Sequence, residues 1–235
     1  PFYTHSYSSA ASVVYKRQPI AINETIYVRT SSSSSAQGIA SIYSFTIDGT
    51  VNWRVENSNS TMSDLTPLVY VGSGQGACGQ WPDMVLVGWS DGLLQALDAH
   101  NGAVVWQHFT EKHSWGITGS MLIEEETVTL PTRNSLDQLC LNGDLLFSQD
   151  IGYGWRNGVT FADGHYWVGD EIGNLWAVNA DVAVNYTVGN GKIRHAPMNL
   201  MNSDLLIHLQ TTSGSTILQF DTCLLYTSPS PRDQL

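Results

Sequence analysis

The sequence has few charged residues, few cysteines and no long apolar segment. Asp, Glu, Lys and Arg make up 13% of its 235 residues, against roughly 25% in an average soluble domain. Ten basic and 21 acidic residues give a net charge of −11, which argues against nucleic-acid binding, since that requires clustered Lys and Arg. No apolar stretch reaches the about 18 residues that a membrane-spanning helix needs, so no transmembrane segment is expected.

The abundant residues are typical of a β-protein. The chain contains 21 glycines and many Ser, Thr and Asn residues, which form the turns between short strands. No helix of useful length is expected. The length allows one large domain at most, because all-β domains commonly reach roughly 200–250 residues as single units.

Both ends of the chain resemble translated sequencing adapters. Residues 14–18 (Val-Tyr-Lys-Arg-Gln) and 223–228 (Cys-Leu-Leu-Tyr-Thr-Ser) can be encoded by DNA strings that are almost reverse complements of each other. Two unrelated protein termini have no reason to show this relation, so we expect 1–18 and 223–235 to be non-native, adapter-like segments. A disordered Ser-rich head and a Ser-Pro-rich tail are the alternative. Residues 19–222 then form the domain.

An internal repeat organises residues 19–222. Each copy reads as an alternating strand, an Asp or Asn turn with Gly, and a second strand that ends on an aromatic residue. The closing aromatics lie 53, 41 and 39 residues apart, at Trp53, Trp106, Phe147 and Tyr186. A fifth copy begins at Thr216. A period near 40 residues built from strands and turns predicts propeller blades.

Further strands complete each predicted blade. An apolar strand lies near the start of a copy at 26–29, 83–88, 165–169 and 205–209. A fourth, innermost strand fits the intervening segments, such as 116–123 and 158–161. The sequence therefore predicts an all-β fold: a β-propeller of four-stranded antiparallel blades, in a partial ring of about four to five blades.

The second copy carries the clearest family signature. Asp91-Gly92, Ala96-Leu97-Asp98, Gly102 and the closing Trp106 resemble the blade repeat of quinoprotein-alcohol-dehydrogenase-like propellers, the pyrroloquinoline-quinone-type repeat. The other copies are degenerate. In that family the closing aromatic docks on the neighbouring blade, and complete members have more blades than this chain. The resemblance therefore implies an incomplete ring, in which the docking residues are Trp53, Trp106, Phe147 and Tyr186.

The repeat itself does not imply a cofactor. In the quinone-dependent dehydrogenases the quinone is held by a Trp platform, a pair of adjacent disulfide-bonded cysteines and Ca²⁺. No adjacent Cys pair exists here, because Cys78 and Cys140 are 62 residues apart. Cys140 occupies the position that Ala96 and Ala177 fill in sister copies, so we interpret it as a buried structural thiol and not as a disulfide or ligand. No cofactor is predicted, and pyrroloquinoline quinone with Ca²⁺ enters only under the dehydrogenase alternative.

Three aromatic and cationic stretches recur in phase, just before the predicted innermost strands. Because in-phase loops meet on one face of a propeller, these side chains can line a shared rim or the central channel. A site for a protein or small ligand on that face is one interpretation. Packing between blades by the two tryptophans, with Arg156 paired to an acidic neighbour, is the other and more common one. The candidate residues are His113, Trp115, Trp155, Arg156, Arg194 and His195.

Three functions remain open. The first, which we favour, is a non-enzymatic scaffold for protein or ligand binding, resembling outer-membrane assembly-type or cell-surface propellers. The second is a fragment of a quinone-dependent dehydrogenase, and the third is a sensor propeller attached to a kinase or another domain. By resemblance alone, we expect an extracytoplasmic location, either periplasmic or at the cell surface.

Overall fold

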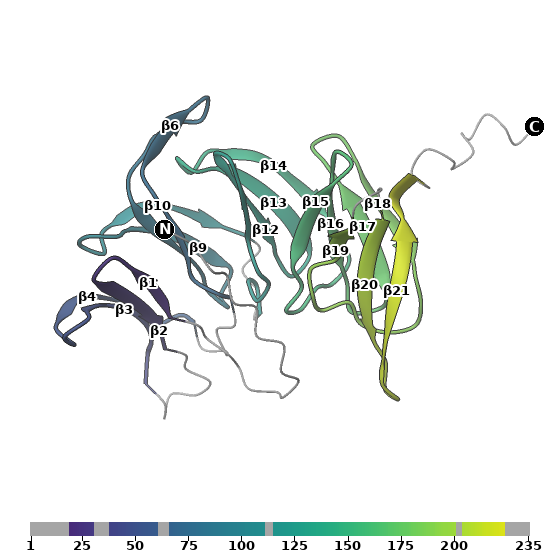
Figure 1. The fold of residues 1–235 in the computed structure, drawn as a ribbon, viewed down its shortest axis with the longest axis horizontal. Coiled ribbons are helices and arrows are strands. Elements are labelled where there is room, and N and C mark those ends of the chain that lie inside the picture. Colours follow the sequence, from purple (N-terminus) through teal and green to yellow (C-terminus); the bar gives the residue numbers. More distant parts are fainter. Residues whose placement is uncertain (1–18, 31–37, 61–65, 111–114, 201–203, 224–235) are drawn as a thin grey trace, which may run out of the picture.

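The computed structural model describes residues 19–30, 38–60, 66–110, 115–200 and 204–223. His113 and the predicted adapter segments, apart from Cys223, lie outside these ranges. The described residues form a two-stranded hairpin and five larger antiparallel sheets, which succeed one another in a row with the first and last at opposite ends (Figure 1). None of the described residues belongs to an α-helix, and none therefore forms a helix able to cross a membrane.

Each of the first four sheets has four strands, and we call the five sheets blades 1 to 5. In the order of their hydrogen bonding, blade 1 is β1 (Ile20–Ile22), β2 (Thr25–Arg29), β3 (Ala40–Thr46) and β4 (Val51–Asn57), and blade 2 is β5 (Val69–Val71), β8 (Met84–Gly88), β9 (Leu93–Asp98) and β10 (Val104–Phe109). Blade 3 is β11 (Leu122–Glu124), β12 (Thr127–Pro131), β13 (Ser135–Cys140) and β14 (Leu145–Asp150), and blade 4 is β15 (Val159–Ala162), β16 (His165–Gly169), β17 (Asn174–Val178) and β18 (Ala183–Thr187). Blade 5 contains β19 (Met198–Leu200), β20 (Asp204–Gln210) and β21 (Ser215–Asp221).

This architecture confirms the predicted all-β fold and its partial ring of four-stranded blades. The four repeat copies coincide with the last two strands of blades 1 to 4. The innermost strand β15 begins at Val159, one residue later than the start of the predicted 158–161 segment. In blade 3 only the end of the 116–123 segment becomes strand β11, because the preceding residues form the connection from blade 2.

The turns explain why these strands end where they do. At the β9–β10 turn the Asp98 carboxylate accepts the backbone N–H groups of His100 and Asn101 at 2.9 and 3.1 Å, and Gly102 adopts a φ of 74°. Such a positive φ is open to Gly without steric cost. Glu125 lies in the tight turn between β11 and β12.

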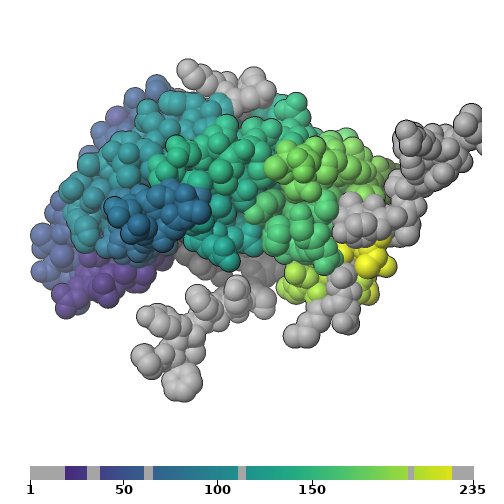
Figure 2. Space-filling view, turned by 90° about the horizontal axis from the view of Figure 1, so that it is seen from above, coloured from purple at the N-terminus to yellow at the C-terminus, as the bar shows by residue number. Residues whose placement is uncertain are grey.

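The blades have two distinct edges. One edge, which we call the turn face, carries the turns between the first and second and between the third and fourth strands of each blade. The opposite edge, which we call the loop face, carries the β8–β9, β12–β13, β16–β17 and β20–β21 turns and the connections from one blade to the next. Figure 2 looks onto the turn face, with the β6–β7 hairpin (Gly74–Gly76 and Gly79–Trp81) in blue.

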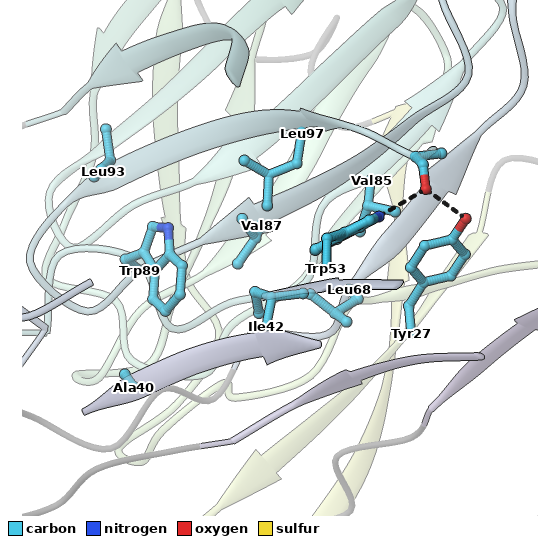
Figure 3. Packing of buried hydrophobic residues seen from close by; sticks show 11 residues of the cluster. Tyr27, Ala40, Ile42, Trp53, Leu68, Val85, Val87, Trp89, Leu93 and Leu97 are labelled. Atoms are coloured by element: carbon cyan, nitrogen blue, oxygen red, sulfur yellow. Dashed lines mark hydrogen bonds between the residues drawn. The ribbon is translucent and has the colours of Figure 1, made fainter. Parts of the chain in front are cut away.

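Adjacent blades pack through buried aliphatic and aromatic side chains. Between blades 1 and 2, Ile42, Val85 and Leu97 are fully buried beside Trp53. The Trp53 Nε1 and the Tyr27 hydroxyl both donate to the Ala99 carbonyl, at 3.0 and 3.1 Å (Figure 3). One carbonyl at the turn of blade 2 therefore receives two donors from blade 1.

The same docking contact recurs between blades 2 and 3. Trp106 Nε1 donates to the Leu141 carbonyl at 2.8 Å, and its ring lies against Gly143. A Cβ atom at Gly143 would lie 2.7 Å from the Trp106 ring, as one at Gly102 would lie 2.8 Å from the Trp53 ring. In blades 2 and 3 the Gly of the third turn thus leaves room for the indole of the preceding blade.

Phe147 and Tyr186 dock differently, because neither carries an indole N–H. The Phe147 ring lies 6.2 Å from that of Tyr166 in blade 4. Hydrogen bonds across this interface come from Gln149, whose Nε2 donates to the Ala180 carbonyl at 2.8 Å, and from Gln138, whose Nε2 donates to the Tyr166 hydroxyl. Tyr186 contacts Phe220 of blade 5, with ring centroids 5.3 Å apart. Gln149 has no distinguishing place in the repeat pattern.

The prediction that Cys140 is an unpaired thiol is wrong. Cys140 forms a disulfide with Cys78, with Cα atoms 5.6 Å apart. Cys78 lies in the β6–β7 hairpin, which is inserted between β5 and β8 of blade 2 and reaches blade 3, where the Cys78 N–H also donates to Glu126 Oε2 at 2.8 Å. The repeat pattern contains no counterpart of this hairpin, so sequence spacing gave no sign that the two cysteines meet. Cys140 itself is buried, as expected.

Candidate binding face

Backbone hydrogen bonds join the loop face of blades 2 to 5. Each connection between blades lies against the central turns of its neighbours, and its amide and carbonyl groups bond to those turns. The donor and acceptor pairs, in order along the face, are Gly116 to Ser90, Arg133 to Gly116, Gly154 to Arg133, Glu171 to Tyr153 and Ile193 to Asp170, at 2.7 to 2.9 Å. These bonds hold the connections in a fixed relation to one another, so side chains from three successive connections come together.

Trp155 is at the centre of this arrangement. The Trp115 ring meets it edge to face, with centroids 6.0 Å apart. The guanidinium carbons of Arg156 and Arg194 lie 4.4 and 4.2 Å from the centre of the Trp155 ring, well within the range of cation–π attraction. The structure thus brings together four of the six candidate residues, from three different connections.

Arg194 also makes the ion pair of this cluster. Its Nε and one terminal nitrogen donate to the two carboxylate oxygens of Glu171, at 2.7 and 2.6 Å. Lys192 Nζ lies 3.5 Å from the same carboxylate. This bidentate geometry is the one in which Arg recognises carboxylates most specifically.

His195 lies beside the cluster, paired with a histidine of blade 5. Its ring centroid is 5.1 Å from that of His208 on β20. Burial lowers the pKa of His195 below its ordinary value, and the neighbouring His208 and Arg156 lower it further. The sixth candidate, His113, lies outside the described residues.

Two residues of the cluster have unusual backbone conformations. Trp115 and Arg156 adopt φ angles of 68° and 58°, which non-glycine residues rarely adopt outside turns. Arg156 is held in this conformation by the Thr118 hydroxyl, which accepts its backbone N–H at 2.9 Å. Such strained residues are often found at functional sites, where the surrounding structure must impose the conformation.

The structure adds residues that sequence reasoning missed. Arg133 lies over the Tyr153 ring, 5.0 Å from its centre, and Tyr153 is 43% exposed. Arg133 and Glu171 lie in the central turns of blades 3 and 4, whereas the repeat analysis considered only the connections between blades. The central turns and the connections lie at the same edge of the blades, and this fact could have indicated Arg133 and Glu171 from the sequence.

The described residues do not fit a bound pyrroloquinoline quinone with Ca²⁺. The Cys78–Cys140 disulfide joins two blades, whereas the dehydrogenase site needs adjacent cysteines. Within the same ranges no three His, Cys, Asp or Glu side chains come close enough to hold a metal ion. What this face offers instead is aromatic surface and fixed positive charge, which suit a binding site for a negatively charged or aromatic group.

Comparison with known proteins identifies the fold. No protein-family model and no curated protein matches the sequence. Among solved structures, BamB from Moraxella catarrhalis matches with a TM-score of 0.57 and 18% identity, over 85% of this chain and 55% of that one. A europium-containing methanol dehydrogenase matches with a TM-score of 0.54 and 13% identity, over 87% and 49% of the two chains.

A quinohemoprotein alcohol dehydrogenase from Comamonas testosteroni matches with a TM-score of 0.56 and 14% identity, over 82% of this chain and 43% of that one. The chain thus spans about half the length of the structures that it resembles. Together with the repeat signature and the indole docking contacts, these matches show that the chain has the fold of the pyrroloquinoline-quinone-type β-propellers.

Proposed function

We propose that the chain is part of a non-enzymatic β-propeller scaffold that binds a protein or ligand at its loop face. The observation that carries this proposal is the cluster of Trp115, Trp155, Arg156 and Arg194 on three successive connections. These side chains come from blades that are rigidly hydrogen-bonded to one another, and rigid loops on a repeat scaffold are well suited to recognition.

An extracytoplasmic location belongs to the same proposal. The Cys78–Cys140 disulfide supports it, because disulfides form and persist in oxidising compartments and are rare in the cytosol. Propellers with this repeat are mostly exported, which points the same way by resemblance.

The test is a comparison of matched substitutions. Partners captured by the protein from an extract of its source would be identified and purified. Their affinities for the unaltered protein and for the variants Trp155→Ala and Arg156→Ala would then be measured by titration. We expect both variants to weaken partner binding about tenfold or more, as residues at the centre of an interface do. The control is Arg54→Ala, because Arg54 also stacks on an aromatic ring, that of Tyr43, but on blade 1 away from the cluster. Unchanged affinity in both Trp155→Ala and Arg156→Ala would refute the proposal.

A quinone-dependent dehydrogenase is the second candidate, favoured by likeness in fold to two alcohol-oxidising enzymes. Adding pyrroloquinoline quinone and Ca²⁺ to the protein and recording its absorption spectrum separates the two candidates. We expect the spectrum of the quinone to be unchanged by the protein. A protein-dependent spectral shift accompanied by alcohol oxidation would establish the dehydrogenase.

A further inference from the structure

The two faces of the propeller differ sharply in charge. No Lys or Arg among the described residues lies on the turn face. The carboxylates there come from all five blades: Glu24, Asp48, Asp83, Asp98, Glu124, Glu125, Glu126, Asp144, Asp163, Asp181, Asp204 and Asp221. The turn face therefore repels anions.

The cations gather at the opposite edge. Of the six Lys and Arg residues that the structure describes, Arg54 lies within strand β4, and the other five lie at the loop face: Arg29, Arg133, Arg156, Lys192 and Arg194. The remaining described carboxylates, six in number, lie at or near this edge or within the strands. Among the described residues, the loop face is thus where cations offset part of the acidic excess, so an anion is repelled less there than at the turn face.

Four of these cations form a continuous strip with the aromatic residues. Arg133 lies over Tyr153, and the backbone of this turn bonds to the next connection, which carries Trp155 and Arg156. Arg194 and Lys192 follow on the connection to blade 5, around Glu171. We call this set, from Arg133 to Lys192, the cationic strip.

We propose that the cationic strip binds an acidic polypeptide segment through its carboxylate side chains. This inference rests on the proposed function and names the chemistry of its partner. The strip already binds one carboxylate, that of Glu171, in bidentate fashion, and incoming Asp or Glu side chains would engage the same guanidinium and ammonium groups.

The extent and charge of the strip favour a polypeptide. It spans turns and connections of blades 3, 4 and 5, which is more than one small anion can contact. Nucleic acids are disfavoured as partners, because their binding requires a larger cluster of Lys and Arg than the four cations of the strip. The exposed Tyr153 and the partly exposed Trp115 and Trp155 supply the aromatic contacts that are enriched at protein interfaces.

The experiment uses a fluorescent oligo-glutamate peptide as the probe, with a neutral Gly-Ser peptide of equal length for comparison. Anisotropy titrations at low and at physiological salt measure binding to the protein and to the double variant Arg133→Glu/Lys192→Glu. We expect the oligo-glutamate peptide to bind, salt to weaken binding, and the double variant to lose about tenfold or more in affinity. Arg54→Glu is the control, since it reverses a charge outside the strip; circular dichroism and melting curves establish that each variant is folded.

Three results would overturn the inference. They are equal binding of the neutral peptide, binding of a sulfated polysaccharide without binding of oligo-glutamate, and unchanged affinity of the double variant. A natural partner whose binding is lost in Trp155→Ala, but does not respond to salt or to charge reversal in the strip, would overturn the acidic segment alone and leave the proposed binding function standing. A natural partner that binds Trp155→Ala and Arg156→Ala as tightly as the unaltered protein would refute the proposed function itself.

Discussion

At the scale of single residues, the indole N–H of the closing tryptophan links one blade to the next. Trp53 and Trp106 both donate to a carbonyl in the third turn of the following blade, and a Gly in that turn makes room for the ring. A buried carbonyl that loses its donor costs about 1–3 kcal/mol. Stability at each of these interfaces therefore depends on both the Trp and the Gly, and substitution of either residue tests this.

We expect Trp106→Phe to lower the free energy of unfolding by about 1–3 kcal/mol, because the Leu141 carbonyl loses its partner. Gly143→Ala should destabilise as well, since its Cβ would clash with the Trp106 ring and its φ of 100° is strained for Ala. Urea denaturation of both variants measures the effect. Gly164→Ala serves as the control, because Gly164 also has a positive φ but no atom lies near its Cβ position. Equal losses in Gly143→Ala and Gly164→Ala would show that backbone strain, and not the indole, is responsible.

His195 should titrate below its ordinary pKa. Burial lowers the pKa of His195, and His208 and Arg156 lower it further, so the unfolded chain takes up this proton at higher pH than the folded one. The contribution of His195 to the free energy of unfolding is therefore complete above the ordinary pKa of about 6.5. It is lost as the pH falls from there toward the lower pKa of the folded protein. Nuclear magnetic resonance of the His195 ring would give the midpoint. His208→Asn should raise the pKa part of the way, and a midpoint at or above the ordinary value in the unaltered protein would contradict the prediction.

At the scale of elements, local signals predicted the blades well and long-range contacts escaped prediction. The third turns of blades 1 to 3 carry Asp or Asn with Gly, and that of blade 4 carries Asn and Asp. Those residues form the turn by themselves, so the hairpins could be placed from the sequence alone. The β6–β7 hairpin is different, because its position is decided by blade 3 through Cys140 and Glu126. The sequence of 74–81 does not indicate which residues of blade 3 the hairpin contacts.

The candidate site shows the same division. In-phase spacing predicted that Trp115, Trp155, Arg156 and Arg194 would share one face, and the structure places them in contact. Their arrangement around a single ring, and the part played by Glu171, depend on hydrogen bonds between connections and turns that are distant in sequence. Periodicity predicts the face on which residues lie, but it does not predict which of them touch.

The disulfide should stabilise the interface between blades 2 and 3. We expect Cys140→Ala to lower the free energy of unfolding by about 2–4 kcal/mol, the usual range for a native disulfide. Alanine is the replacement of choice, because it removes the sulfur of the buried Cys140 and adds no new group. The double variant Cys78→Ala/Cys140→Ala should be no less stable than Cys140→Ala, since one bond is lost in both. Stability equal to that of the unaltered protein under non-reducing conditions would contradict the disulfide.

At the scale of the whole molecule, charge is separated between the two faces. The turn face holds 12 described carboxylates and none of the described Lys or Arg residues. Repulsion among these groups opposes folding and is strongest at low salt, where the screening length is about 30 Å at 0.01 M against about 10 Å at 0.1 M. This separation of charge therefore has a cost in stability.

This cost predicts that the melting temperature rises when NaCl increases from about 0.01 to about 0.1 M. Asp181→Lys, which places a cation in an exposed turn of the turn face, should raise the melting temperature at low salt and reduce its salt dependence. The expected gain in the free energy of unfolding is about 0.2–1 kcal/mol, as is typical of surface charges. Asn190→Lys introduces the same side chain at an exposed position of the loop face, where cations already lie, and should not stabilise. A melting temperature that is unchanged or falls over this range of NaCl, or equal stabilisation by both lysines, would show that the charge separation does not affect folding.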